Sequence, residues 1–197
     1  MTLPIRTTSC EIRKARKEDA REIAKLFLIA SDGLAAYIWS KHQVPGMSLH
    51  DVGAARYARE QTMFSYQNCM MAERGGEIAG MIHCHPETGP PEEVTESDPV
   101  LRPYVELALD ASLYVSGVAV YEQHRGTGIG TDLMQFAFAH AKELGLEKVS
   151  LICFERNEGA MRLYRRLGFS EIDRRAIVPH ETLHYRDGDA LLMARGV

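Results

Sequence analysis

The chain has 197 residues, of which 45% are hydrophobic and 25% are charged. This is the composition of an ordinary globular protein, and it excludes intrinsic disorder, collagen-like repeats and small disulfide-rich scaffolds. The net charge of −4 lacks the basic excess of a nucleic-acid coat, so any anion site must be local. We expect a single domain over residues 1–197, because no internal repeat, low-complexity segment or linker divides the chain.

The sequence predicts a cytoplasmic protein without membrane, metal or nucleic-acid partners. Basic and acidic residues are mixed over residues 1–21, which lack the apolar core of a signal peptide. No stretch approaches the roughly 18 apolar residues that span a bilayer. The scattered cysteines Cys10, Cys69, Cys84 and Cys153 have no Cys-x-x-Cys spacing, which is typical of buried thiols in a reducing compartment.

The N-terminal part predicts a strand followed by two helices. Residues 10–13 form the expected strand. A helix over residues 18–30 is predicted because apolar and small side chains recur at helical spacing, at Ala20, Ile23, Ala24 and Phe27. Ser48 precedes a second helix, since Asp51 three residues later completes a variant capping box.

A hairpin and a long loop follow. The apolar runs 69–73 and 77–84 predict an antiparallel pair, because Gly75 and Gly76 between them can adopt the positive φ angles of a tight turn. Five prolines in residues 86–103 predict a surface loop that is neither strand nor helix. The seven acidic residues against one arginine in residues 87–110 indicate either a solvated acidic loop or a lid that attracts an amine.

The second half of the chain alternates strands and helices. The predicted elements are a strand at 113–121, a helix at 130–144, a strand at 148–154, a helix at 157–167, and two strands at 171–178 and 190–194 joined by a turn at 186–189.

A glycine-rich turn between the strand at 113–121 and the next helix is the first functional pattern. Residues 125–130 read Arg-Gly-Thr-Gly-Ile-Gly, and glycines let an anion approach the unpaired N–H groups of a helix N-terminus. The turn therefore predicts a phosphate or pyrophosphate site. It is not a Rossmann fingerprint, because Thr131 or Leu133 stands where the third glycine is needed, and no Gly-Lys pair occurs for a P-loop.

Two motifs together resemble the GNAT acetyltransferase family. Arg125, Gly128 and Gly130 form Arg-x-x-Gly-x-Gly, which is similar to that family's coenzyme A pyrophosphate loop. Residues 157–169 fit its pattern Asn-x-x-Ala-x-x-Leu-Tyr-x-x-x-Gly-Phe, in the same order and at a matching separation. Residues 11–84 resemble the family's opening elements more weakly, and only the loop at 86–103 has no detailed match.

The resemblance implies an α/β (α+β) fold in a single domain, with a mixed, mostly antiparallel sheet of about seven strands flanked by helices. It also implies that the strands around Val118 and Ile152 are parallel neighbours that splay apart in a V around acetyl-coenzyme A. Gly117 fits this expectation, because a glycine inside a strand often marks a bulge. The alternative is that Gly117 allows close packing.

The resemblance also assigns roles to particular residues. A strand backbone would pair with the pantetheine arm, the N–H groups of the turn would hold the pyrophosphate, and Arg125 can approach phosphate oxygens with a bidentate fork. The Val120 N–H would stabilise the oxyanion, and Tyr164 would be the catalytic acid that protonates the departing thiolate. The residues implied to bind the coenzyme are Val118, Ala119, Val120, Arg125, Gly126, Thr127, Gly128, Ile129, Gly130, Thr131, Asn157, Ala160 and Tyr164.

The general base is left open by the sequence. Histone-acetylating members of the family carry a glutamate where this chain has Tyr114. Glu155, His83, His85 or a chain of water molecules could accept the proton of the amine.

The implied function is acetyl-coenzyme A-dependent N-acetylation of a primary amine, by direct attack in a ternary complex. The acceptor is a small-molecule amine or a peptide N-terminus, and the protein is expected to be a monomer or homodimer. Two alternatives are a transferase of another acyl group and a catalytically silent coenzyme A-binding sensor or partner protein. The intact Tyr164 and Asn157 favour the enzyme.

Overall fold

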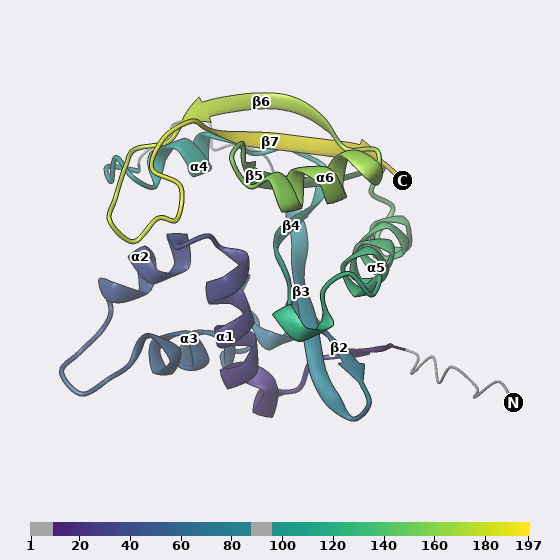
Figure 1. Ribbon diagram of the computed structural model, residues 1–197, viewed down its shortest axis with the longest axis horizontal. Coiled ribbons are helices and arrows are strands. Elements are labelled where there is room, and N and C mark those ends of the chain that lie inside the picture. Colours follow the sequence, from purple (N-terminus) through teal and green to yellow (C-terminus); the bar gives the residue numbers. More distant parts are fainter. Residues whose placement is uncertain (1–9, 88–95) are drawn as a thin grey trace, which may run out of the picture.

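The computed structural model describes residues 10–87 and 96–197, and in them seven strands form one sheet (Figure 1). The strand order is β1-β2-β3-β4-β5-β7-β6, and every neighbouring pair is antiparallel except β4 and β5, which run parallel. This confirms the predicted mixed, mostly antiparallel sheet. The strands are β1 (Glu11–Lys14), β2 (Cys69–Arg74), β3 (Glu77–Glu87), β4 (Ser112–Val120), β5 (Lys148–Phe154), β6 (Ser170–Ala176) and β7 (Asp189–Gly196).

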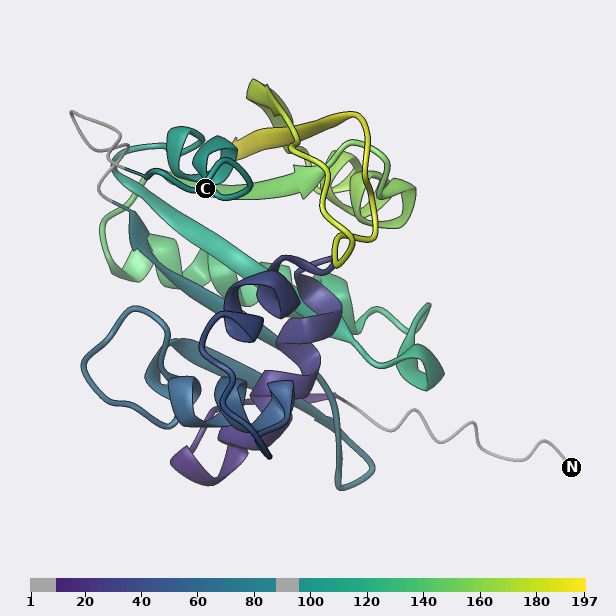
Figure 2. The same ribbon diagram turned by 90° about the vertical axis from the view of Figure 1, so that its left-hand side faces the viewer.

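Helices cover both faces of the sheet (Figures 1 and 2). Helices α1, α2 and α3 share a hydrophobic core with one face, and α5 and α6 share a core with the other. Adjacent residues of β3 show why both faces are apolar, since Met81 belongs to the first core and Ile82 to the second. The α-helices are α1 (Ala20–Ala30), α2 (Leu34–Ser40), α3 (Leu49–Tyr57), α4 (Arg102–Glu106), α5 (Ile129–Glu143) and α6 (Glu158–Arg166).

Local sequence signals explain the first helices and the hairpin. The four residues predicted to face the core from α1, at positions 20, 23, 24 and 27, are all buried. At α3, Ser48 Oγ accepts from Asp51 N at 3.2 Å and the Asp51 carboxylate accepts from Ser48 N at 3.0 Å, which confirms the capping box. Gly75 and Gly76 have φ values of +64° and +85°, as the tight turn between β2 and β3 requires.

The predicted loop at 86–103 is wrong at both ends. Strand β3 continues through Pro86 to Glu87, which pair with Leu113 and Ser112 of β4. The pairing of β3 with β2 ends at His83, so beyond it β3 is an edge strand, and an edge tolerates proline. At the other end, α4 begins at Arg102. Residues 88–95 of the predicted loop lie outside the described residues.

The acidic excess of residues 87–110 is partly neutralised by ion pairs. Asp98 accepts a hydrogen bond from the Tyr37 hydroxyl at 2.9 Å and pairs with Lys41. Glu106 pairs with Arg102 and Arg175, at 3.0 Å in each case. These two carboxylates therefore fasten their segment to α2 and β6, and they are not free to attract an amine.

The predicted splay between β4 and β5 is present. The two strands pair with each other from Ser112 and Lys148 to Val115 and Leu151. Beyond that point both strands continue, but they no longer pair with each other. A bulge lies at the same level, because His83 opposes Gly117 while Cys84 opposes Val115, which leaves Ser116 as the extra residue of β4.

Gly117 also satisfies the packing alternative. A Cβ at this position would lie 2.9 Å from the Phe27 ring and 3.2 Å from the Cβ of Ala30. Glycine therefore lets α1 press against β4 directly beside the bulge. The structure therefore agrees with both interpretations of Gly117, a bulge in the strand and close packing against a helix.

The long segment between β6 and β7 reaches across to the turn between α1 and α2 (Figure 2). His184 N donates to Asp32 O at 2.9 Å. Gly33 has a φ of +96°, and a Cβ there would lie 2.0 Å from the carbonyl oxygen of Thr182. Helix α2 was not predicted, because it is short and begins after this glycine instead of a side-chain cap.

Three observations bear on the predicted partners. No helix in residues 10–87 and 96–197 combines the length and apolar character needed to cross a membrane. The four cysteines are free thiols, and three of them are buried. The same residues contain no group of three or more side chains arranged to hold a metal ion.

The contact at Gly33 gives a stability prediction. We expect Gly33→Ala to lower the free energy of unfolding by about 1–3 kcal/mol more than Gly46→Ala, because only the first substitution overlaps a neighbouring backbone. Gly46 shares the positive φ, at +85°, and a Cβ there meets nothing within 4 Å. Urea unfolding of both variants measures the difference, and equal losses would show that the contact with Thr182 carries no energy.

Candidate active site

A cleft of about 1050 Å³ lies where β4 and β5 part. It contains every residue predicted to bind a coenzyme except Thr127, whose hydroxyl instead donates to His124 O at 2.6 Å. The sequence motifs therefore converge on one site. The predicted residues that line it are Val118, Ala119, Val120, Arg125, Gly126, Gly128, Ile129, Gly130, Thr131, Asn157, Ala160 and Tyr164.

Strand β4 presents an open backbone edge to this cleft. Tyr121 N donates to Ala79 O of β3 at 2.9 Å. Because hydrogen-bonding groups alternate along a strand, the N–H and C=O of Val120 point to the opposite side, where β5 has already diverged. The Arg125 Nε group donates to Val120 O at 3.1 Å, in agreement with this orientation.

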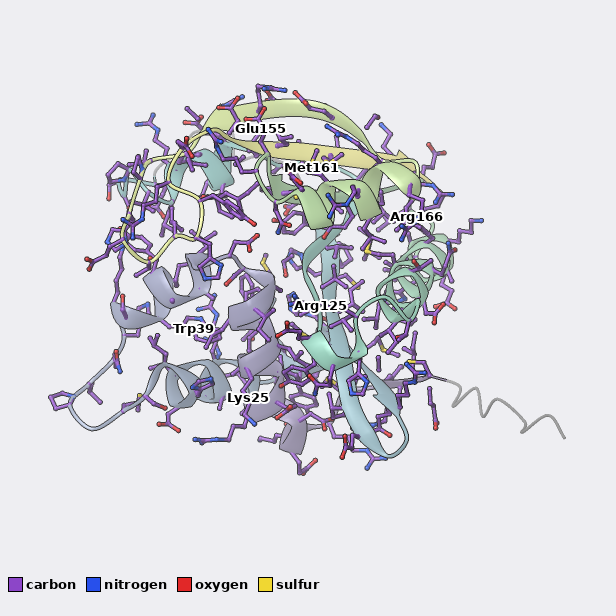
Figure 3. The ribbon with its side chains drawn as sticks, in the orientation of Figure 1. Lys25, Trp39, Arg125, Glu155, Met161 and Arg166 are labelled. Carbon is purple, nitrogen blue, oxygen red and sulfur yellow. The ribbon has the colours of Figure 1, made fainter. Side chains whose placement is uncertain are left out.

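The turn between β4 and α5 has the geometry of an anion site. Gly126 and Gly128 have φ values of +74° and +94°, and a Cβ at either position meets nothing within 4 Å. The first backbone hydrogen bond of α5 runs from Thr131 N to Gly128 O at 2.8 Å, so the N–H groups just before it are not used by the helix. Arg125 lies at this turn, below α6 in Figure 3, and adds a positive charge.

Tyr164 lies on α6 with its side chain turned into the cleft. The residue is 8% exposed, and its hydroxyl makes no hydrogen bond within the described part of the chain. Burial raises the pKa of the Tyr164 phenol far above its ordinary value, and the neighbouring Cys153 and Asp32 add to the rise. The phenol is therefore protonated at neutral pH and free to donate.

Asn157 braces the cleft through both polar atoms of its side chain. Its Oδ1 accepts from Ala160 N at 3.1 Å and so caps α6, and its Nδ2 donates to Asp32 Oδ2 at 2.8 Å. This pair joins α6 to the turn between α1 and α2. The predicted role of Asn157 in the site is therefore accompanied by a structural one.

Asp32 is a site residue that the sequence analysis missed. It lines the cleft with a side chain only 15% exposed, and burial raises the pKa of its carboxyl despite the opposing hydrogen bond from Asn157. The turn Ser31-Asp32-Gly33 was the available signal, but it marks a helix-to-helix turn only once α2 is recognised. Asp32 and Glu96 are the carboxylates of the described residues that line the cleft.

The three side chains considered as a general base do not line the cleft. Glu155 pairs with Arg174 at 3.7 Å and lies beside β6 and β7, near the top of Figure 3. His85 Nδ1 is 3.1 Å from Pro86 O, so this nitrogen carries the proton, and Nε2 is buried without a partner in the described residues. The alternative of a water chain stays open.

His83 is held as a neutral, structural imidazole. Its Nε2 is 3.0 Å from Met63 O, and a carbonyl can only accept, so Nε2 carries the proton and Nδ1 accepts from the Ser116 hydroxyl. Burial is the main cause that lowers the pKa of His83 to about 3. The imidazole therefore anchors the bulged residue of β4.

Comparison with known proteins defines the class to which this fold and site belong. The model of the acetyltransferase (GNAT) family matches residues 35–169. The chain therefore belongs to this family.

Two relatives and one solved structure illustrate the similarity. The mycothiol acetyltransferase of Parafrankia sp. is 35% identical over 57% of this chain and 34% of its own length. An N-alpha-acetyltransferase of Sulfurisphaera tokodaii is 41% identical over 41% of this chain and 46% of its own. The chain thus spans about a third to a half of these relatives. The protein yncA of Salmonella typhimurium, solved with its cofactor acetyl-CoA, shares the fold at 18% identity with a TM-score of 0.60, over 95% of this chain and 94% of its own.

The neutral state of His83 gives a pH prediction. Its pKa is lowered by folding, so the stability that the neutral ring contributes is complete above about pH 6.5 and is lost as the pH falls from there towards about 3. We expect one histidine to keep the Nε2–H tautomer in NMR spectra from about pH 8 to 5. A titration of every imidazole in that range would refute the assignment.

Proposed function

We propose that this protein transfers an acetyl group from acetyl-coenzyme A to a primary amine, by direct attack of the amine while both substrates are bound. The observation that carries this proposal is the meeting of three features in one cleft: the open edge of β4, the turn at residues 125–130 and the Tyr164 hydroxyl. Membership of the GNAT family and the acetyl-CoA in the similar structure from Salmonella typhimurium support it.

The residues of the cleft fit this coenzyme. We assign the open edge of β4 at residues 118–120 to its extended pantetheine arm, because amide groups along that arm can replace the missing strand. We assign the N–H groups of residues 126–130 and the terminal nitrogens of Arg125 to its pyrophosphate. Acetyl-coenzyme A then supplies the acetyl group as an activated thioester.

Three groups of the chain would carry the proton and charge movements. The Val120 N–H donates to the carbonyl oxygen on which negative charge develops. The Asp32 carboxylate accepts the proton that the amine loses as its nitrogen bonds to the acetyl carbon. Tyr164 gives its proton to the sulfur as the carbon–sulfur bond breaks.

Acceptor and assembly remain predictions. A peptide N-terminus is supported by the N-alpha-acetyltransferase relative, and a small-molecule amine by the mycothiol acetyltransferase relative. We retain a single domain over residues 1–197, a monomer or homodimer, and a cytoplasmic location as predictions.

A panel of amines, assayed with acetyl-coenzyme A and with a longer acyl-coenzyme A, separates an acetyltransferase from a transferase of another acyl group. It also separates both from a silent sensor, because a sensor binds the coenzyme without turnover.

Tyr164→Phe tests the catalytic acid. We expect kcat to fall about 10²–10⁴-fold, because the phenylalanine ring preserves the packing but has no proton to give. Acetyl-coenzyme A affinity, measured by calorimetry, should change little. A kcat like that of the wild type, or a loss confined to coenzyme binding, would remove Tyr164 from the chemistry.

Asp32→Asn tests the proton acceptor, with Glu96→Gln as the matched control from the same cleft. A base must be deprotonated, so kcat/KM should fall as the pH decreases through the raised pKa of Asp32. In Asp32→Asn we expect kcat/KM no longer to fall at acidic pH, and its maximum value to drop about 10²-fold or more. In Glu96→Gln, kcat/KM should still fall at acidic pH as it does in the wild type. An unchanged fall of kcat/KM at acidic pH in Asp32→Asn would exclude the role.

A further inference from the structure

The cleft contains a cation that the proposed acetyl transfer does not use. Arg56 lies on α3 and lines the cleft, and its guanidinium forms no hydrogen bond or ion pair with the residues that the structure describes. The Arg56 side chain is half-buried, which lowers its pKa, and withdrawing a cation from water without an ion-pair partner is unfavourable. An unpaired guanidinium in a ligand cleft indicates an anionic ligand.

The contrast with other arginines of the chain strengthens this inference. Arg13, also partly buried, pairs with Asp19 at 2.7 Å and with Glu73 at 2.6 Å. Arg175 likewise has two carboxylate partners. Of these three partly buried arginines, Arg56 is therefore the one without a carboxylate partner in the described residues.

Arg56 is held in place by an aromatic stack. Its Cζ lies 4.3 Å from the centroid of the Phe64 ring. Phe64 in turn stacks on His83, with ring centroids 5.3 Å apart and planes inclined by only 4°. Because His83 is fixed by Met63 and Ser116, the stack orients the guanidinium face, and the N–H donors at its edge remain available for a bidentate partner.

The position of this stack separates it from the coenzyme phosphates. Figure 2 shows the turn between β4 and α5 on one side of α1, and the segment between α3 and β2, which carries Phe64, on the other. The cleft around the stack is otherwise apolar, with Phe27, Trp39 and Met63 among its lining residues. Arg56 therefore belongs to the end of the cleft where an acceptor would enter.

We propose that the acceptor is a primary amine that also carries a carboxylate, and that this carboxylate pairs with Arg56. The inference rests on the proposed acetyl transfer and adds the class of acceptor. A planar carboxylate matches two N–H donors of a guanidinium, and the ring beneath excludes water from one face of the pair. The carboxylate belongs either to a free amino acid or to a peptide with an acidic residue near its N-terminus.

Matched acceptor pairs test this proposal. Free amino acids are compared with their carboxamides, and peptides with Asp or Glu near the N-terminus with the same peptides carrying Asn or Gln. We expect wild-type kcat/KM to favour the carboxylate member of at least one series about 10–100-fold, through KM. The series that shows the preference identifies the source of the carboxylate.

Arg56→Gln should remove the preference while transfer to the neutral member continues, and Arg56→Lys should restore part of it. Arg59→Gln is the control, because Arg59 is an exposed arginine nearby that does not line the cleft. Equal use of both members by the wild type, or an equal loss for both in Arg56→Gln, would overturn the proposal and leave N-acetylation standing.

If no amine is acetylated, the proposed function fails separately, and calorimetry with the same pairs decides about Arg56. Tighter binding of the carboxylate member by the wild type, lost in Arg56→Gln, supports the anion site. Equal binding of both members contradicts it.

Discussion

The early end of pairing between β4 and β5 is the constraint on which the site depends. Beyond Val115 and Leu151 the two strands share no hydrogen bonds, so β4 turns backbone groups such as the Val120 N–H towards the cleft. The fold maintains this gap with the bulge at Ser116 and with α1, which packs directly on Gly117. An extended ligand with amide groups of its own would satisfy the strand edge, so the site is paired in full only when occupied.

The walls of the cleft are fastened to one another across the gap. Asn157 caps α6 and reaches Asp32, whose carbonyl oxygen receives the backbone N–H of His184. On the opposite side, His83 joins Met63 to the bulged residue of β4 and supports Phe64 and Arg56. Both links use polar groups whose partners lie far away in sequence. Such contacts preorganise the cleft and leave Tyr164 and Arg56 as side chains with free donors.

The parts of the site that could be predicted from the sequence are those whose residues lie within one short segment of the chain. The glycine turn and the helix bearing Tyr164 each carry their residues within a short segment, and the structure places all of them except Thr127 in one cleft. Asp32 and Arg56 could not be predicted as site residues, because only their tertiary contacts place them in the cleft. The continuation of β3 through Pro86 was not predicted, because a count of prolines does not show that this part of the strand lies at an edge, where proline is tolerated.

Hydrogen–deuterium exchange with and without acetyl-coenzyme A tests the central claim most directly. If the coenzyme completes the open edge of β4, the amides of Val118 and Val120 should exchange more slowly in the complex, together with those of residues 126–130. Amides of the β6 and β7 pairing should not change. Unaltered exchange at Val118 and Val120 under saturating coenzyme would contradict the account, because the gap between the strands would then serve some other purpose.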